Sequence, residues 1–262
     1  MTSLVYVYAI LPRPIATNLA GIDAQPVRWV VDDGLAAAVS DVPAEDFDEA
    51  PLNDNIRDMV WLGPRAVAHQ DVNARLHEQA EAIVPLAFGT VFRDDDRVRH
   101  LLHDQRPALV ERLRAVRDST EWVISLHLLN ELDTDALATA SPALQALRQE
   151  IATSTPGRAH LLQRRLAELE RDERRRLEAE SRQQLIEALR EIASAVYLEP
   201  LPSDTVERPL VRASLLVPRA DASRFIEHIE RLRVQWPEPV YRLLISGPWP
   251  PYRFGGLQPV DA

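Results

Sequence analysis

The first third of the chain alternates between short apolar runs and stretches with helical spacing. Residues 4–10, Leu-Val-Tyr-Val-Tyr-Ala-Ile, are apolar at every position, which predicts a strand buried on both faces and central in its sheet. Runs over 26–31 and 34–39 predict two short strands, because Asp32-Asp33-Gly34 between them is a hairpin turn signal. The chain is therefore expected to begin with three strands.

Helical spacing takes over at residues 53–82. Apolar side chains recur there at roughly the spacing of one helix face. Gly63-Pro64 is expected to break or cap this helix, because proline cannot donate the internal hydrogen bond. The predicted apolar stripe consists of Ile56, Val60, Val67, Val72, Leu76 and Ile83.

Two further strands and a helix are expected before residue 130. Residues 84–92, Val-Pro-Leu-Ala-Phe-Gly-Thr-Val-Phe, and residues 121–128 each predict a short strand. The helix between them has Asp94 or Asp95 as its N-cap. Pro107 is expected to kink this helix or divide it in two.

The second half begins with one helical pattern from residue 156 to residue 196. Leucine, isoleucine and valine recur at steps of three, four or eight among alternating arginines and acidic residues. At ~1.5 Å per residue, such a helix is about 55–60 Å long. Its narrow apolar seam predicts a helix that packs along one side or projects. The simpler alternative is a solvated face with weak i,i+4 ion pairs.

A β-α-β pattern follows a proline-rich link over 200–209. Residues 210–217 and 240–245 predict strands, and residues 221–234 predict the helix between them, with Phe225, Ile229 and Leu232 facing inward.

These elements predict an α+β fold of two small domains with ferredoxin-like β-α-β elements. Strands and helices interleave over the N-terminal domain, 1–130. The C-terminal domain, 131–262, contains the long helix (about 156–196), the β-α-β unit (210–246) and a proline- and aromatic-rich tail (247–262).

The tail carries the densest run of aromatic and proline residues. After Ser246-Gly247 come Pro248-Trp249-Pro250-Pro251-Tyr252-Arg253-Phe254. Three prolines in four positions are not expected to continue a strand, since proline lacks a donor and fixes φ. The segment is expected to leave the sheet as a polyproline-like strap. Its rings either cover an open face of their own domain or dock another protein.

Large aromatic side chains are most often core residues. We therefore expect core positions for Phe88, Phe92, Trp249, Tyr252 and Phe254, and for Trp29, Trp61 and Trp236. Gly89, Gly247 and Pro248 are expected to set backbone geometry.

Composition narrows the class of protein. The 262 residues carry a formal net charge of −10, which disfavours a general nucleic-acid binder because phosphate requires excess positive charge. No apolar run reaches the ~18–20 residues that span a bilayer, and no basic segment precedes the first strand, so neither a membrane span nor a secretory signal is expected. Cysteine is absent, which excludes disulfides and thiol catalysis. A cytoplasmic protein is expected.

No motif for catalysis or for cofactor binding assembles in the sequence. There is no glycine-rich phosphate loop and no Gly-x-Ser-x-Gly nucleophile elbow. Adjacent aspartates at 94–96 fit helix capping better than a calcium loop, whose ligands alternate. His100 and His103 are three apart and His69 and His77 are eight apart, but no third metal ligand has matching spacing. We therefore expect no enzyme, no cofactor and no metal.

Five stretches in order along the chain carry a resemblance to a known family. They are Tyr6–Ile10, Val84–Phe92, Glu121-Trp122, Gly157–Leu162 and Ser246–Phe254. Together they resemble the gas vesicle proteins of the GvpF/GvpL family, and the second and last stretches are the most specific. The sequence departs from the family at two positions: His160, where the family often has tyrosine, and Ala87, where many relatives carry a basic residue.

The resemblance implies a structural or interaction role for its motif positions. These positions are Tyr8, Pro85, Leu86, Phe88, Gly89, Thr90, Phe92, Gly157, Arg158, Gly247, Pro248, Trp249, Pro250, Pro251, Tyr252 and Phe254.

The resemblance also implies a non-enzymatic protein of gas vesicle formation. The gas vesicle is a gas-filled cytoplasmic organelle whose shell is built from the small hydrophobic protein GvpA. The implied protein is an assembly factor or minor structural protein that binds GvpA and other accessory proteins, in the cytoplasm and at the vesicle. It would cover apolar surface that aggregates in water. No nucleic acid or lipid membrane is expected as a partner.

Two alternatives remain. The same scaffold could hold a ligand-binding or enzymatic site, which a deep polar pocket around His69, His77 or His100 would favour. The chain could also be a self-associating structural component whose helix 156–196 pairs between copies.

Overall fold

The protein divides into two compact units, which are described separately. The structure, a computed structural model, describes residues 3–16, 18–129, 141–201, 208–236 and 240–256. Unit 1 comprises Met1–Trp122, Leu216–Ala220 and Gly247–Ala262, and unit 2 comprises Val123–Leu215 and Asp221–Ser246.

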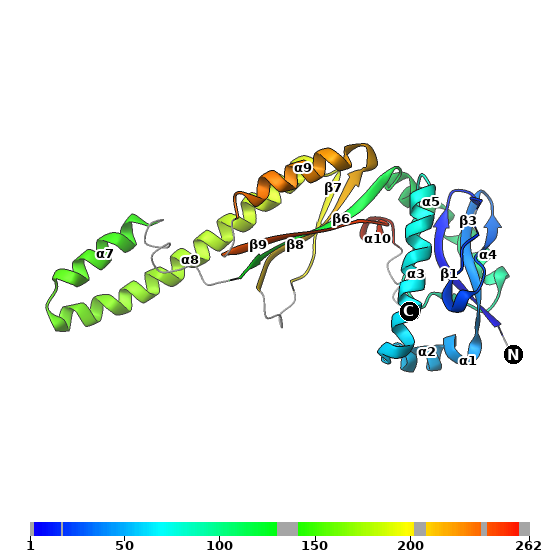
Figure 1. The fold of residues 1–262 in the computed structure, drawn as a ribbon, viewed down its shortest axis with the longest axis horizontal. Helices are drawn as coiled ribbons and strands as arrows, with labels where there is room; N and C mark the ends of the chain where they lie inside the picture. The colour runs from blue at the N-terminus through cyan, green and yellow to red at the C-terminus, as the bar shows by residue number, and fades with distance from the viewer. Residues whose placement is uncertain (1–2, 17, 130–140, 202–207, 237–239, 257–262) are drawn as a thin grey trace. The chain divides into compact units, whose positions relative to one another are not determined.

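Unit 1 is built on a five-stranded antiparallel sheet. Its strands are β1 (Ser3–Leu11), β2 (Arg28–Asp32), β3 (Leu35–Pro43), β4 (Val84–Pro85) and β5 (Val91–Phe92). The order is β2-β3-β1-β4, and β5 also pairs with β1, so β1 is central (Figure 1). Every residue from Leu4 to Leu11 in β1 is buried, which confirms the prediction of a strand covered on both faces.

Short and long helices cover this sheet. They are η1 (Ile22–Ala24), α1 (Ala44–Phe47), α2 (Glu49–Asn55), α3 (Met59–Gln79), α4 (Asp95–Asp104), α5 (Arg106–Ala115) and α10 (Tyr252–Gly255). Pro107 lies in the first turn of α5, so the predicted division of one helix into two is confirmed.

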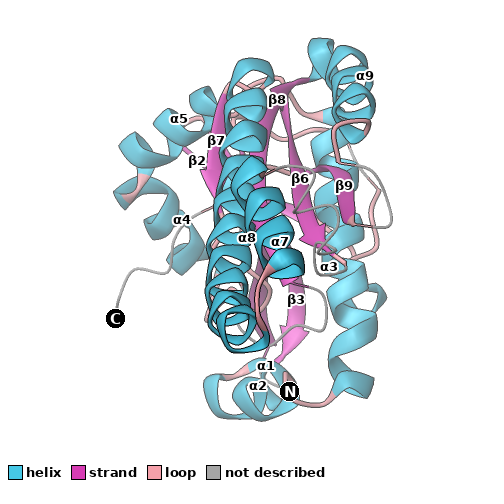
Figure 2. Ribbon diagram, turned by 90° about the vertical axis from the view of Figure 1, so that its left-hand side faces the viewer, coloured by secondary structure: helices cyan, strands magenta, loops and turns pink. Residues whose placement is uncertain are grey.

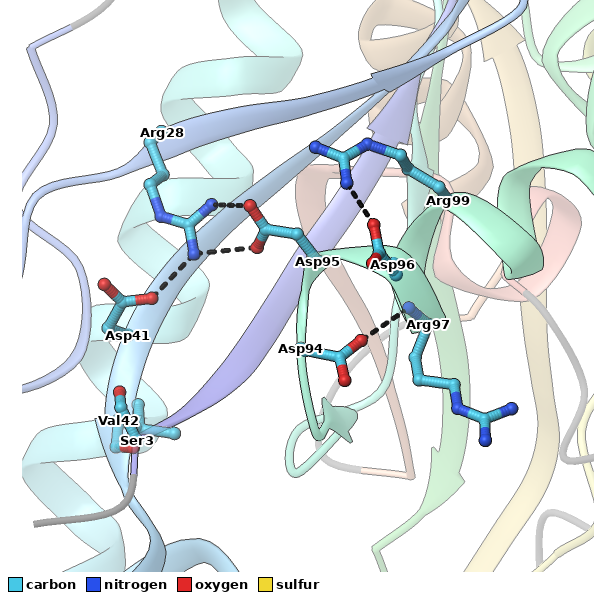
Figure 3. A network of polar contacts seen from close by, with 9 residues as sticks. All are labelled: Ser3, Arg28, Asp41, Val42, Asp94, Asp95, Asp96, Arg97 and Arg99. Atoms are coloured by element: carbon cyan, nitrogen blue, oxygen red, sulfur yellow. Dashed lines mark hydrogen bonds and ion pairs between the residues drawn. The ribbon is translucent and has the colours of Figure 1, made fainter.

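The three adjacent aspartates, 94–96, lie at the N-terminal end of α4. The Asp94 carboxylate accepts the Arg97 backbone N–H at 2.8 Å, which confirms the predicted cap. Asp95 pairs with both terminal nitrogens of Arg28 on β2, at 3.0 and 2.9 Å (Figure 3). Asp96 accepts from the Arg99 guanidinium at 2.5 Å. Each carboxylate therefore has a structural partner.

Helix α3 differs from its predicted pattern in two ways. It continues through Pro64, which has no backbone N–H to donate within the helix. Val60 and Val67 are 84% and 61% exposed, so the predicted stripe is wrong in the N-terminal half of the helix. The buried face carries His69, Val72, Asn73, Leu76 and His77.

The stretch 84–92 is not one strand. It forms β4 and β5 with a turn between them, because Gly89 has φ +86°, a conformation that side chains with a Cβ rarely adopt. The prediction of a continuous strand is therefore wrong, although both ends pair with β1.

Unit 2 contains most of a four-stranded antiparallel sheet. Its order is β7 (Ala195–Leu198), β8 (Arg208–Pro218), β6 (Ser119–Leu128) and β9 (Tyr241–Trp249). The helices are α7 (Pro142–Thr153), α8 (Pro156–Ile192) and α9 (Ala222–Arg233), and the short η2 (Arg219–Asp221) spans the division between the units.

The long predicted helix is present as α8, which has 37 residues and ends four residues earlier than expected. The inward side of α9 is confirmed, since Phe225, Ile229 and Leu232 are buried. With two antiparallel sheets and helices in both units, the predicted α+β class is confirmed. The ferredoxin-like detail stays a prediction.

The proline-rich tail does not leave the sheet where the sequence predicted. Strand β9 runs through Ser246, Gly247 and Pro248 to Trp249. The sheet order places β9 at an edge, where a strand tolerates a residue without a backbone donor. Trp249 is 39% exposed, so its predicted core position is wrong. Beyond it, the described tail residues belong to unit 1.

Candidate interaction site

A column of polar side chains lies on the buried face of α3. His69, Asn73 and His77 are spaced four residues apart, so they share that face. The Asn73 amide donates to His69 Nε2 at 3.0 Å. The proton of the neutral ring is therefore on Nδ1, which donates to the Tyr6 hydroxyl on β1 at 2.9 Å.

The C-terminal tail is bonded to the same column through Tyr252. Asn73 also donates to the Tyr252 hydroxyl at 3.1 Å, and that hydroxyl donates to Gln70 Oε1 at 2.9 Å. Burial raises the pKa of Tyr252 to about 12. The hydroxyl is therefore neutral at physiological pH and acts as both acceptor and donor.

Burial also controls the charge of the ring at the centre of the column. It lowers the pKa of His69 from 6.5 to about 4, so the ring is neutral at pH 7. Burial raises the pKa of Tyr6 well above its usual value. The column is a neutral hydrogen-bond network that connects β1, α3 and the tail.

His77 has a cationic neighbour. The Arg219 guanidinium donates to the His77 carbonyl and lies 3.1 Å from His77 Nδ1. Burial, and secondarily the arginine charge, lower the pKa of His77 to about 4. The neutral ring accepts from the guanidinium, and this contact fixes the C-terminal end of α3 to residues 216–220 of the same unit.

The loop 86–90 completes the site from the opposite side. The Gly89 N–H donates to the Tyr6 hydroxyl at 3.1 Å. Phe88 packs edge-on against Tyr6 and His69, with ring centroids 5.9 and 5.8 Å apart. Trp61 on α3 also meets Phe88 edge-on, and its ring lies 4.4 Å beneath the Arg65 guanidinium carbon.

These elements border an open pocket of about 370 Å³. We call it the α3 pocket; it is lined by Ala66, His69, Gln70, Leu86, Ala87, Phe88 and Tyr252. Most of its walls are apolar, and both ring nitrogens of His69 are engaged within the network. The arrangement suits the docking of an apolar group better than proton transfer.

Helix α3 also carries exposed apolar side chains, at positions near the pocket residues Ala66, His69 and Gln70 along the chain. We call Met59, Val60 and Val67 the α3 apolar face; they are 72%, 84% and 61% exposed. Val60 and Val67 are seven residues apart and share one side of the helix. Ala66 and Gln70 of the pocket come from the same two to three turns.

A family model described as gas vesicle synthesis protein GvpL/GvpF matches residues 4–255. The chain belongs to the GvpL/GvpF family. The resemblance that the sequence motifs indicated is thereby confirmed over nearly the whole chain.

Individual relatives agree with the family. Gas vesicle protein L of Streptomyces sp. (strain CB03234) is 31% identical over 270 aligned positions, which cover 98% of this chain and 95% of that protein. Gas vesicle protein F of the same strain is 30% identical, with 97% of this chain and 99% of that protein covered.

Two crystal structures share the fold. GvpF from Microcystis aeruginosa has a TM-score of 0.70 at 20% identity, with 97% of this chain and 99% of that chain covered. GvpF from Anabaena sp. PCC7120 has a TM-score of 0.74 at 19% identity, with 98% and 99% covered. The shared fold extends over nearly the full length of both chains.

The structure brings part of the predicted GvpL/GvpF motif set together. Leu86, Phe88 and Tyr252 line the α3 pocket, and Gly89 bonds its network. Tyr8 is not among the residues that line the pocket. Its hydroxyl contacts Ser40 Oγ at 2.7 Å and accepts the Ile22 N–H at 2.8 Å.

Other motif residues support the strands around the site. Pro85 pairs with Ala9, and the Thr90 hydroxyl donates to the Ala87 carbonyl at 2.8 Å. Phe92 is half-buried, not fully in the core as predicted. Phe88, Tyr252 and Phe254 are half-buried as well, and so are Trp29 and Trp61, whereas Trp236 is buried.

The tail motif lies against Glu121-Trp122. A Cβ on Gly247, which has φ +136°, would lie 2.9 Å from both the Glu121 carbonyl oxygen and the Trp122 ring. Arg253 donates its backbone N–H to Glu121 Oε2 at 2.7 Å. Pro248 follows Gly247 through a cis bond, and Pro250 and Pro251 are buried.

Gly157 and Arg158 do not join this site. They lie at the start of α8 in unit 2, where the Arg158 guanidinium contacts Glu150 at 2.6 Å. The ion pair between Arg158 and Glu150 joins the start of α8 to α7, and a role for Gly157 and Arg158 in the family stays a prediction.

Asn73 and Gln70 belong to the site but to no motif in the sequence. The eight-residue spacing of His69 and His77, taken as possible metal-ligand spacing, does not indicate Asn73, which lies halfway between them. The four-residue spacing of 69, 73 and 77 was the available signal for a polar column.

The histidines do not gather with acidic residues into a metal site in the described part of the chain. Among the described residues, no group of three or more His, Asp or Glu side chains is placed to hold an ion. His100 is exposed, and His103 lies 3.6 Å from Asp32. No helix of the described ranges combines the length and apolar character needed to cross a bilayer.

Proposed function

We propose that this chain is a non-enzymatic gas vesicle assembly factor or minor structural protein that binds the shell protein GvpA. The observation that carries the proposal is the match of residues 4–255 to the GvpL/GvpF family. Its relatives of about the same length are named gas vesicle proteins L and F. On this proposal the protein acts in the cytoplasm and at the vesicle, with GvpA and other accessory proteins as partners.

The physical need for such a protein follows from the shell. A subunit destined to face gas exposes apolar surface, and that surface aggregates in water unless a partner covers it. Unit 1 offers a suitable surface, since the α3 apolar face is exposed and the α3 pocket next to it is open. An apolar segment of GvpA that docked along α3 would bury both.

The alternative of a ligand-binding or enzymatic site receives less support. The pocket around His69 is open and mostly apolar, and His69 already bonds Tyr6 and Asn73. A general base needs a free nitrogen within reach of its substrate. His77 is engaged by Arg219 and His100 is on the surface, so the three histidines do not converge.

Co-expression with GvpA tests the proposal. The full chain, carrying an affinity tag, is expected to retain GvpA in a soluble complex, and deletion of its gene is expected to lower the yield of vesicles. Normal vesicle yield in the deletion strain, together with no retained GvpA, would contradict the proposal. Turnover of a small molecule by the purified protein would contradict the non-enzymatic part.

A further inference from the structure

Helices α7 and α8 form an antiparallel hairpin in unit 2. They are joined at Ser154-Thr155 and run side by side in both ribbon views (Figures 1 and 2). Leu144 of α7 is fully buried and packs against Leu166, Leu169 and Leu177 of α8. These contacts hold the two helices together along one seam.

A groove of about 560 Å³ lies along this hairpin. We call it the α7–α8 groove. Its lining residues are Ala143, Ala146, Leu147 and Glu150 from α7, and Arg165, Glu168, Leu169 and Asp172 from α8. The four residues from each helix follow the same spacing, at positions i, i+3, i+4 and i+7. Each set therefore forms one continuous stripe, and the groove runs parallel to both helices.

The floor of the groove is shaped for a third helix. Ala143 and Ala146 are exposed and small, so they allow a close approach of another backbone. Leu147 of the α7 stripe is buried and Leu169 of the α8 stripe is half-buried, and both contribute apolar surface to the lining of the groove. A third helix that inserts one side chain per turn would bury the groove by ridges-into-grooves packing.

The charged residues on the rim of the groove indicate which charge a bound helix would carry. Three carboxylates, Glu150, Glu168 and Asp172, face it, against one guanidinium, Arg165. Glu150 is paired with Arg158 at 2.6 Å, while Asp172 has only a 4.0 Å contact with Arg175. Two carboxylates on α8 are thus exposed beside an apolar floor, a pattern complementary to basic residues that flank an apolar stripe.

We propose that the α7–α8 groove binds a basic amphipathic α-helix of a partner protein. The apolar stripe of that helix would lie on Ala143, Ala146, Leu147 and Leu169, and its lysines or arginines would meet Glu168 and Asp172. This site is separate from the α3 pocket and does not depend on GvpA binding.

The probe for the test is a designed helical peptide of roughly 20 residues with leucine at i, i+3, i+4 and i+7 and lysine on both sides of that stripe. Its affinity for the full chain is measured by fluorescence anisotropy. The blocking variant is Ala143→Arg with Ala146→Arg, which fills the floor and adds positive charge. The matched control is Gln145→Arg with Gln149→Arg, on the same helix, exposed, outside the groove and with the same change in net charge.

The blocking variant is expected to weaken binding by about tenfold or more, and the control by less than about twofold. Glu168→Gln with Asp172→Asn, which leaves the floor intact, is expected to weaken binding about threefold and to reduce its salt dependence. Circular dichroism establishes that each variant keeps its helical content.

Three results would overturn the proposal. The first is equal affinity of the blocking and control variants for the peptide. The second is equal binding of a peptide with glutamate in place of lysine. The third is self-association of the full chain, measured by light scattering, that disappears in the blocking variant, because the occupant would then be a second copy of this chain.

Discussion

Gly247 shows how one residue determines the path of the tail. Its φ of +136° is open to glycine, and an added Cβ would meet the Glu121 backbone and the Trp122 ring at 2.9 Å. Neither neighbour is the flexible end of a side chain. The tail can therefore pass Glu121-Trp122 only with a glycine at this position.

Gly247→Ala is expected to destabilise the protein by about 2–4 kcal/mol, because it adds backbone strain to a steric clash. Gly157→Ala is the matched control, since nothing lies within 4 Å of its Cβ and alanine favours a helix. That variant is expected to be neutral or stabilising by less than about 1 kcal/mol. Urea denaturation of both variants measures the difference, and equal midpoints would contradict the argument.

His69 and His77 determine how the stability depends on pH. Burial lowers both pKa values from 6.5 to about 4, so the unfolded chain binds more protons between these values. The stabilising contribution is complete above pH 6.5 and is lost as the pH falls towards 4. The shift corresponds to at most on the order of 3 kcal/mol per ring.

The free energy of unfolding is therefore expected to fall between pH 6.5 and about 4, beyond the contribution of the carboxylates. The variant His69→Gln with His77→Gln is expected to flatten this dependence. His100→Gln, at an exposed site on α4, should leave it unchanged. Denaturant titrations across this pH range provide the test; parallel curves for the wild type and the buried double variant would refute it.

Hydrogen bonds attach the tail segment 250–256 to two helices of unit 1, α3 and α5. Tyr252 bonds Asn73 and Gln70 of α3. The Arg112 guanidinium of α5 donates to the Gly256 carbonyl. Because α10 has only four residues, these contacts rather than its own helical hydrogen bonds hold it in place.

Tyr252→Phe removes two hydrogen bonds and leaves Gln70 without this donor. We expect a loss of stability of about 1–2 kcal/mol and faster amide exchange in residues 252–256. Tyr241→Phe is the control, since its hydroxyl makes a longer 3.3 Å contact with Ser181. Hydrogen-exchange mass spectrometry resolves the two cases, and unchanged exchange in the Tyr252 variant would argue against tail anchoring.

For the binding of a partner protein to the whole molecule, the distribution of exposed apolar side chains is more informative than the net charge of −10. Isolated exposed apolar residues are common on protein surfaces. The α3 apolar face is different because it groups three of them on one helix close to an open pocket. On the proposed function, this grouping is where GvpA contacts the chain.

Val60→Glu with Val67→Glu is expected to reduce the GvpA retained by the tagged full chain about tenfold, because it places two charges on the apolar face. Val234→Glu is the control, since Val234 is 80% exposed, similar to Val60, but lies after α9 in unit 2. Equal retention by the two variants would place the GvpA contact elsewhere and leave the family assignment intact.

Local sequence determined those elements whose signals act within a few residues. The continuous apolar run 4–10 predicted a strand buried on both faces, and Pro107 divided one helix into two. Asp94 capped α4 because its carboxylate reaches a backbone N–H only three residues away. Five motif stretches also indicated the family, and the family model matches residues 4–255.

Tertiary structure alone decided which face of α3 is buried. The helix has valines on both sides, so its pattern fits two orientations; packing against β1 selected the side with His69 and Asn73, whose polar atoms find partners there. It also decided that a strand could continue through Gly247-Pro248, because β9 lies at a sheet edge where a missing donor is tolerated. Contacts between segments far apart in the sequence, such as the 179-residue separation of Asn73 and Tyr252, leave no local pattern from which they could be predicted.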